Sequence, residues 1–267
     1  MEDIKMADII AEIKKDYIYT LAEKDMRVDG RALDQYRPIS LEVGTIGRAQ
    51  GSARVKIGNT QVLVGTKLGI GEPFPDSPNE GVLTVNAELV PLASPTFEPG
   101  PPDENAIELA RVVDRGIRES EAIQLDKLCL IEGEKVWVTF VDIHVIDHDG
   151  NLIDASALGA IAALMNTKLP TARVEKGEVI TDDETMISLS IARKPIACTF
   201  AKINGKLMLD PSLDEEHIME TRITITTDEE GNLRAMQKGE TGYFIKEELI
   251  KAVQIAREKS QELRKLL

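Results

Sequence analysis

The sequence predicts an α+β fold built as two layered lobes. Three observations support this. Hydrophobic residues recur with period two over 39–92 and again over 187–237, helical patterns follow each of these runs, and a polar stretch at 170–185 separates them. We therefore divide the chain into an N-terminal helical segment (1–26), a first lobe (27–172) and a second lobe (173–267).

The first predicted elements are a helix and an antiparallel sheet. Ile9, Ile13, Tyr17 and Leu21 recur at helical spacing and predict an amphipathic helix over 4–24. Strands are predicted next, because apolar residues alternate with polar ones, as in the run Ala53, Arg54, Val55, Lys56, Ile57. The dipeptide Gly58-Asn59 is typical of a hairpin turn. A further strand is expected at 82–92. Two proline-rich segments, 71–78 and 94–102, are expected to be ordered loops at one edge of the sheet.

Two helices and one strand complete the first lobe. Asn105, with Glu108 three residues later, predicts a capping box that begins a helix ending near Ile123. A strongly apolar strand is expected at 136–145. Asp154 or Ser156 then caps a helix through Met165, and because this helix is rich in small residues on all sides we expect it to be buried.

The second lobe repeats the order of strands followed by a helix. Turn residues at Asn204-Gly205 and at 230–232 separate the apolar runs. Strands are predicted at 187–191, 196–203, 206–209, 221–227 and 233–237. The chain ends in a predicted helix over 245–267, in which Leu249 and Val253 face inward.

Composition restricts the classes of function. The 46 acidic residues outnumber the 32 basic ones and give a net charge of −14, which repels nucleic acid at long range, so a nucleic-acid role would require a local basic site. Cys129 and Cys198 lack a zinc-ligand spacing. The N-terminus is charged and no apolar run reaches about 18 residues, so we expect a cytoplasmic protein without a signal peptide or membrane span.

Several longer motifs carry a specific resemblance. Residues 27–31 read Arg-Val-Asp-Gly-Arg, and 89–105 form a long segment rich in proline that leads into the helix containing Arg111, Arg115 and Arg118. Asp154-Ala-Ser-Ala-Leu158 precedes the small-residue helix. Over nearly its whole length the chain resembles the RNase PH family, and in particular the non-catalytic subunit of the archaeal exosome.

The resemblance implies an RNase PH-type fold and a place in a ring. In that ring, three heterodimers pair this kind of subunit with a catalytic paralogue, and RNA-binding cap subunits sit on one face. The complex degrades the 3′ end of single-stranded RNA with inorganic phosphate. No cofactor and no membrane are implied.

Comparison with the family's active pattern predicts no catalytic residue and no metal site in this chain. Active members carry Gly-Ser/Thr-Arg after an Asp-Gly, whereas here Asn151, Leu152 and Ile153 follow Asp149-Gly150. Leu152 and Ile153 offer no group to an anion at a helix start. The position of an essential Asp falls on Arg222, which stays protonated and cannot act as a base or metal ligand, and the preceding acidic position falls on Glu216.

The predicted RNA-binding residues are Arg111, Arg115 and Arg118, which lie on one helical stripe. Spacing alone favours a salt-bridged surface helix, with the pairs Glu108–Arg111, Asp114–Arg118 and Arg115–Glu119. The resemblance instead implies that this helix faces the partner's active site and that its arginines bind the RNA backbone, Arg118 with the least support of the three. Arg27 and Arg31 could also contact RNA, but we favour a structural pairing with Asp29.

Two other hypotheses remain from the sequence. The chain could itself be a phosphorolytic or metal-dependent nuclease, with Asp142 and His144 on one strand face as candidate metal ligands. A packed His144 and a turn at 147–150 are the simpler interpretation. A purely architectural ring member without RNA contact is the third possibility.

Overall fold

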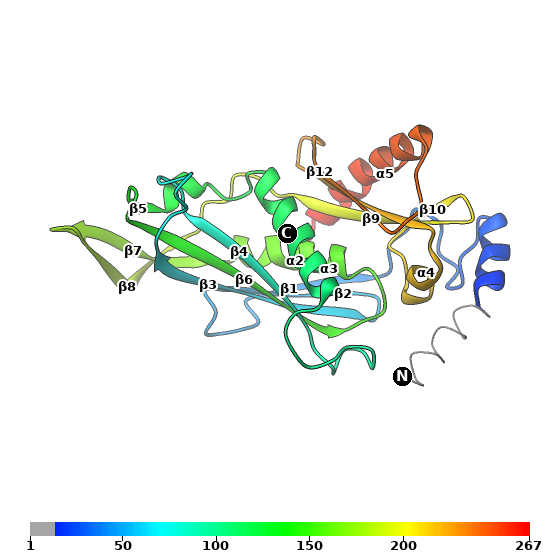
Figure 1. The fold of residues 1–267 in the computed structure, drawn as a ribbon, viewed down its shortest axis with the longest axis horizontal. Coiled ribbons are helices and arrows are strands. Elements are labelled where there is room, and N and C mark those ends of the chain that lie inside the picture. The colour runs from blue at the N-terminus through cyan, green and yellow to red at the C-terminus, as the bar shows by residue number, and fades with distance from the viewer. Residues whose placement is uncertain (1–13) are drawn as a thin grey trace.

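The computed structural model describes residues 14–267 and confirms an α+β fold of layered sheets and helices (Figure 1). A mixed sheet of six strands forms the first lobe, in the order β1-β2-β3-β6-β4 with β5 on β6, and only the β4–β6 pair is parallel. Its strands are β1 (Ile39–Val43), β2 (Gly51–Ile57), β3 (Thr60–Gly71), β4 (Val82–Leu89), β5 (Cys129–Ile131) and β6 (Lys135–Asp147). Helices α2 (Glu104–Glu119) and α3 (Leu152–Met165) and the short η1 (Leu125–Leu128) accompany it.

The second lobe is a four-stranded antiparallel sheet with the order β10-β9-β11-β12. Its elements are β9 (Ile196–Ile203), β10 (Lys206–Leu209), α4 (Leu213–Ile218), β11 (Thr221–Thr227), β12 (Leu233–Gly239) and α5 (Lys246–Arg264). A separate hairpin of β7 (Lys168–Glu175) and β8 (Glu178–Ser188) connects the two lobes. No helix in the part of the chain that the structure describes is long and apolar enough to cross a membrane.

Helix α3 lies at the centre of the core, as its small residues predicted. It packs against β2 and β3 of the first sheet and against β9 of the second. At Gly159 an added Cβ would lie 2.8 Å from a methyl group of Val64, so only glycine allows this approach. Small side chains therefore let one helix contact both lobes closely.

Both predicted helix starts in the first lobe are wrong. Helix α2 is capped two residues earlier than expected, because Asp103 and not Asn105 accepts the backbone N–H of Ala106 (2.8 Å), and it ends at Glu119. Asp154 and Ser156 do not cap α3, because both are buried within it, and Asn151 in a left-handed conformation precedes the helix. A local cap pattern cannot reveal that Asp154 accepts hydrogen bonds from Tyr36 and Thr199.

The polar stretch at 170–185, predicted only as a separator of the two lobes, forms strands, and the strand predicted at 187–191 ends at Ser188. These residues form the β7–β8 hairpin, with Lys176 and Gly177 at the turn in left-handed conformations. Nearly every residue of β8 is exposed, so the alternation that reveals a half-buried strand is missing. The division of the chain at residue 172 stays a prediction.

Elements β5, η1 and α4 were not predicted from the sequence, and β4 ends at Leu89 before Pro91.

The described part of the N-terminal helix, residues 14–23, packs on the second lobe. Ile18 and Ala22 are buried against Ala201 and Met208, whereas the predicted inward residue Tyr17 is exposed. The helix is therefore rotated from the predicted face. Its expected beginning at 4–13 lies outside the described residues.

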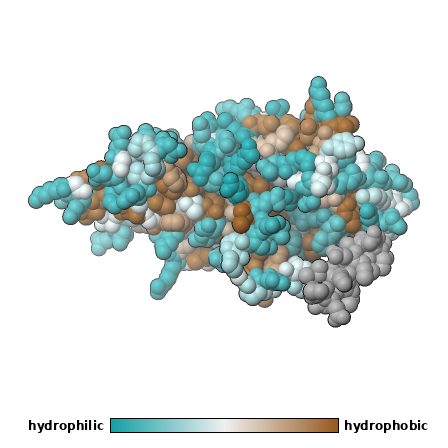
Figure 2. Space-filling view, in the orientation of Figure 1, coloured by the Kyte–Doolittle hydropathy of each residue, from teal (hydrophilic) through white to brown (hydrophobic). Residues whose placement is uncertain are grey.

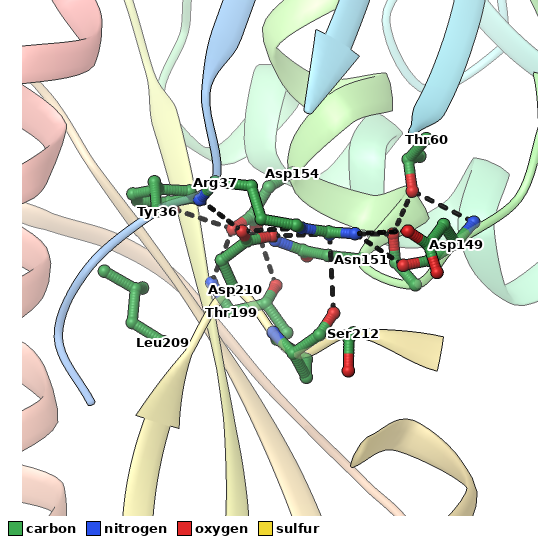
Figure 3. Close-up of polar contacts among 12 residues, drawn as sticks. Tyr36, Arg37, Thr60, Asp149, Asn151, Asp154, Thr199, Leu209, Asp210 and Ser212 are labelled. Carbon is green, nitrogen blue, oxygen red and sulfur yellow. Dashed lines mark hydrogen bonds and ion pairs between the residues drawn. The ribbon is translucent and has the colours of Figure 1, made fainter. Parts of the chain in front are cut away.

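Buried ion pairs join the two lobes (Figure 3). Asp210 in the second lobe accepts from Arg37 Nη2 (2.8 Å), Arg31 Nη1 (2.8 Å) and Asn151 Nδ2 (2.7 Å) of the first. Burial alone would raise the pKa of Asp210, but the bonds and charge of Arg37 and the bond from Asn151 hold it below its usual value. The carboxylate is thus stabilised in its charged form.

Arg27 and Arg31 take part in the same junction; the predicted pairing with Asp29 forms for Arg31, whereas Arg27 pairs with Glu215 of the second lobe. Arg27 is buried and donates through Nε to Glu215 Oε1 (2.9 Å) and through Nη1 to the Leu209 carbonyl (2.7 Å). Arg31 pairs with Asp29 through Nε and Oδ2 (2.6 Å), in addition to Asp210. Both guanidinium groups are therefore occupied by the chain itself.

Removing the charge of Asp210 should weaken the whole fold. In Asp210→Asn the two arginines lose a buried counter-charge, and we expect the free energy of unfolding to fall by about 3–5 kcal/mol. The matched control is Asp25→Asn, which removes an exposed partner of Lys206 and should cost less than about 1 kcal/mol. Urea denaturation followed by circular dichroism measures both, and equal losses would contradict the assigned role of the junction.

Candidate functional site

Helix α2 presents its arginines to solvent along one face. Ala106, Leu109, Val113 and Ile117 are buried on the opposite face, so the amphipathic pattern fixes the rotation of the helix. Arg111, Arg115 and Arg118 are all exposed, as predicted from their spacing. Figure 2 shows a hydrophilic surface over α2 near the centre of the view.

The three arginines differ in what already binds them. Arg118 forms an ion pair with Asp114 (Nη2 to Oδ1, 2.8 Å) and donates to the Leu83 carbonyl (3.1 Å). Among the described residues, Arg115 has only a long hydrogen bond to the side-chain oxygen of Gln237 on β12 (3.3 Å). Arg111 makes no side-chain hydrogen bond or ion pair with any residue that the structure describes. Of the pairs expected from spacing, Asp114–Arg118 forms, whereas Glu108 pairs elsewhere.

A wide groove runs along this face, with a volume of about 830 Å³. All three arginines line it, together with Thr84 of β4 and Gln237 of β12. Acidic residues also lie along it, among them Glu104 and Glu119. Because these carboxylates repel phosphates, a single strand of nucleic acid would have to follow the arginine side of the groove. Both lobes therefore contribute to one open surface, which sequence spacing could not show.

A smaller cavity of about 290 Å³ lies on the other side of Glu108, which lines both spaces. Here the positions compared with active relatives come together: Leu152 and Ile153 from the start of α3, Glu216 from α4 and Arg222 from β11. The fold thus gathers residues that are 70 positions apart in sequence, from 152 to 222, into one cavity.

The start of α3 offers little to an external anion. The backbone N–H of Asn151 donates to Glu216 Oε1 (2.8 Å), so a carboxylate of the chain itself already uses this donor. Leu152 and Ile153 present aliphatic side chains to the cavity. Burial raises the pKa of Glu216 from its ordinary value of 4.5 to about 7, although Asn151 and Arg222 favour the charged form.

Arg222 also has a partner within the chain. Its Nη2 pairs with Glu108 Oε1 at 2.5 Å, across the gap between β11 and α2. On the same cavity wall His148 stacks on Phe97, with ring centroids 5.3 Å apart, and burial lowers the pKa of His148 to about 4. The neutral imidazole and the Arg222–Glu108 pair were missed by sequence reasoning, because no local pattern links these residues.

The Asp142 and His144 cluster does not form a metal shell. Asp142 accepts from Asn86 Nδ2 (3.2 Å), and His144 Nδ1 lies 3.2 Å from Glu88, both across the β4–β6 pair. Residues 14–267 contain no group of three or more His, Cys, Asp or Glu arranged to hold a metal ion. The strand pairing accounts for both side chains.

Sequence comparison shows the family of this chain. Residues 35–170 match domain 1 of the 3′ exoribonuclease family, RNase PH, and residues 194–259 match its domain 2. The chain belongs to the 3′ exoribonuclease family. This confirms the predicted RNase PH-type fold, and the groove and the smaller cavity are lined by residues of the matched family domains.

Similar relatives match along nearly their whole length. The exosome complex component Rrp42 of Methanothermobacter thermautotrophicus is 54% identical over 260 residues, covering 97% of this chain and 96% of the relative. The protein of the same name from Pyrococcus abyssi is 56% identical over 262 residues, covering 97% and 95%.

Solved structures of the family are also similar. A chain of the Archaeoglobus fulgidus exosome with RNA bound to the active site superposes with a TM-score of 0.88 at 49% identity, covering 96% of this chain and 98% of that one. A chain of an archaeal exosome core gives a TM-score of 0.83 at 45% identity, covering 97% and 99%. Rice Rrp46, at 18% identity and a TM-score of 0.67, shares the fold.

The raised pKa of Glu216 predicts a pH-dependent contribution to stability. Because the folded carboxyl titrates near 7 and the unfolded one near 4.5, this contribution is largest below pH 4.5 and is lost as pH rises through 7. Glu216→Gln keeps an acceptor for Asn151 but does not titrate. Its stability relative to the wild type should therefore be greater at about pH 8 than at about pH 5 in urea denaturation. Glu240→Gln, at the exposed rim, should follow the wild-type profile, and parallel curves for both variants would refute the assignment.

Proposed function

We propose that this chain is the non-catalytic subunit of an archaeal exosome, a complex that degrades RNA from its 3′ end with inorganic phosphate. One observation carries the proposal: arginine groups with few internal partners line an open groove, while the Asn151 N–H and Arg222 beside the neighbouring cavity are already paired within the chain. The named relatives, which match over nearly all of their length, support it because they are exosome components.

The proposed role of the groove is to hold the RNA backbone. Arg111 has no partner among residues 14–267 and Arg115 is only weakly held, so both guanidinium groups can bind phosphate oxygens with two parallel hydrogen bonds. Arg118 already shares its charge with Asp114 and contributes less. The net charge of −14 makes this local site necessary, because the rest of the surface repels RNA.

The proposed absence of catalysis has a physical basis. A phosphorolytic site needs an anion held near the scissile bond and a group that transfers a proton. At the corresponding places this chain has Leu152 and Ile153 beside a donor taken by Glu216, and Arg222 neutralised by Glu108. We infer that the catalytic paralogue supplies both groups.

The chain then acts by positioning. It would fix the last nucleotides of a single-stranded 3′ end so that phosphate bound to the paralogue attacks a correctly placed bond. This role requires a composite site, which fits three heterodimers in a hexameric ring with RNA-binding cap subunits on one face, in the cytoplasm. No observation on the described residues favours the alternative of a catalytic or metal-dependent nuclease. The arginine variants described below distinguish the proposed RNA-binding role from that of a purely architectural ring member.

Reconstitution tests the division of labour. The purified chain alone should show no phosphate-dependent decay of a single-stranded RNA. The catalytic paralogue alone should be weakly active, and the mixture should be more active by about tenfold or more, since correct orientation lowers the barrier. Phosphate-dependent release of nucleoside diphosphates by this chain alone would refute the proposal.

Arginine variants test the RNA-binding role of α2 in the assembled complex. Arg111→Ala with Arg115→Ala should weaken RNA binding and reduce the slope of log affinity against log salt by about 0.7 for each phosphate that the variant no longer binds. The matched control, Lys246→Ala with Lys251→Ala, removes the same charge from the exposed side of α5. If both double variants reduce the slope equally, or neither does, α2 does not bind RNA.

A further inference from the structure

Acidic side chains compete with RNA for the arginines of the groove. Besides the three arginines, its lining includes four carboxylates, those of Glu104, Glu108, Asp114 and Glu119. The groove by itself therefore carries one more negative than positive charge, which would repel a phosphate backbone. Whether an arginine here can bind phosphate depends on what holds the nearest carboxylates.

Two of these carboxylates are neighbours of Arg111 along the helix. Glu108 precedes Arg111 by three positions and Asp114 follows it by three, and residues at this spacing lie next to one another on a helix surface. Opposite charges placed in this way usually attract one another into an ion pair. An Arg111 paired with either carboxylate would have less of its charge to offer to RNA.

Both carboxylates are held by other arginines. Asp114 accepts from Arg118, one helical turn further along α2 (Nη2 to Oδ1, 2.8 Å). Glu108 pairs across the gap to the second lobe, where its Oε1 lies 2.5 Å from Nη2 of Arg222 on β11. Arg111 is consequently left without an ion pair among residues 14–267.

The two pairs differ in where their arginine lies. Arg118 belongs to α2 and lines the groove itself, whereas Arg222 comes from the second lobe and lines the neighbouring cavity. The Arg222 side chain is 15% exposed and that of Glu108 is 41% exposed. Because the guanidinium group is largely enclosed, solvent and salt screen its attraction for Glu108 less than they would on an open surface.

The second sheet leaves room for this guanidinium group. Gly239 of β12 pairs with Arg222 across the β11–β12 ladder, and α2 packs against β12. An added Cβ at Gly239 would lie 2.7 Å from Nη2 and 2.8 Å from Nε of Arg222, so any other residue there would displace the guanidinium group. The side chain of Arg222 therefore passes over a glycine on its way to Glu108.

We propose that Arg222 is a positioning residue for RNA binding: by holding Glu108 it keeps this carboxylate away from Arg111 and leaves the Arg111 guanidinium group available to phosphate. The inference rests on the proposed function of the groove, and it adds a role for a residue that does not line the groove. It also gives a reason for an arginine at a position where it can neither transfer a proton nor bind a metal ion.

Removal of Arg222 tests the proposal in the assembled complex. Arg222→Met keeps an aliphatic side chain but releases Glu108, which should pair with Arg111 and repel phosphate. We expect the affinity for single-stranded RNA to fall by about threefold to tenfold. The matched control is Arg234→Met, which removes the same charge from the same lobe, where Arg234 pairs with Asp228 and not with a residue of α2. Fluorescence anisotropy of a labelled RNA should place this control within about twofold of the wild type.

Glu108→Gln distinguishes positioning from a merely structural ion pair. Both Arg222→Met and Glu108→Gln break the pair, but Glu108→Gln also removes the competing carboxylate, so it should bind RNA at least as tightly as the wild type. Adding Glu108→Gln to Arg222→Met should restore the affinity to within about twofold of the wild type. This rescue cannot come from a repaired fold, because the ion pair is still missing, and circular dichroism shows whether each variant keeps the wild-type fold.

A crystal structure of Arg222→Met shows the position of Glu108 without RNA, and its carboxylate should lie within about 4 Å of the Arg111 guanidinium group. Equal losses in the two single variants, no rescue in the double variant, or a Glu108 turned away from Arg111 would overturn the positioning role. A loss of affinity in Arg111→Ala with Arg115→Ala but not in Arg222→Met would overturn this inference alone. Unchanged affinity in all of these variants would overturn the proposed function and the inference with it.

Discussion

The buried carboxylate of Asp210 is the interaction on which the arrangement of the two lobes depends. It accepts hydrogen bonds from Arg31, Arg37 and Asn151, all of which lie in the predicted first lobe. Next to it Arg27 and Glu215 form a second buried pair. Separating the lobes differently would leave these buried charges without partners, which costs several kcal/mol of free energy.

This placement determines the chemistry of the neighbouring cavity. The Asp210 segment leads into α4, which carries Glu216 to the start of α3, where it accepts from Asn151. Strand β11 then carries Arg222 towards Glu108 on α2. The elements that meet at this junction thus supply internal partners to the Asn151 N–H and to Arg222 beside the cavity. The proposed loss of catalysis is consistent with these internal pairings.

The outer surface differs from the interior in how its side chains are paired. On α2 the buried face fixes the helix and leaves Arg111 without a partner among the described residues, and apolar side chains on both faces of the β7–β8 hairpin are exposed, among them Val174 and Ile187. Charges that would cost free energy if left unpaired in the interior are paired around Asp210, whereas these outer groups are available for binding. Function in this chain is therefore expected at surfaces that a second molecule completes.

The sequence by itself determined the α+β class, the buried small-residue helix, the arginine stripe and the family, because each is encoded in local spacing or a contiguous motif. It failed where long-range contacts decide the outcome. Asp154 resembles a helix cap but is buried as an acceptor for Thr199 and Tyr36. The polar residues at 170–185 were expected only to separate the lobes but form a hairpin, because backbone pairing between strands does not require a hydrophobic pattern. Only the tertiary structure decided which arginine is left without an internal partner and which carboxylate lies at α3, because these pairings join residues far apart in the chain.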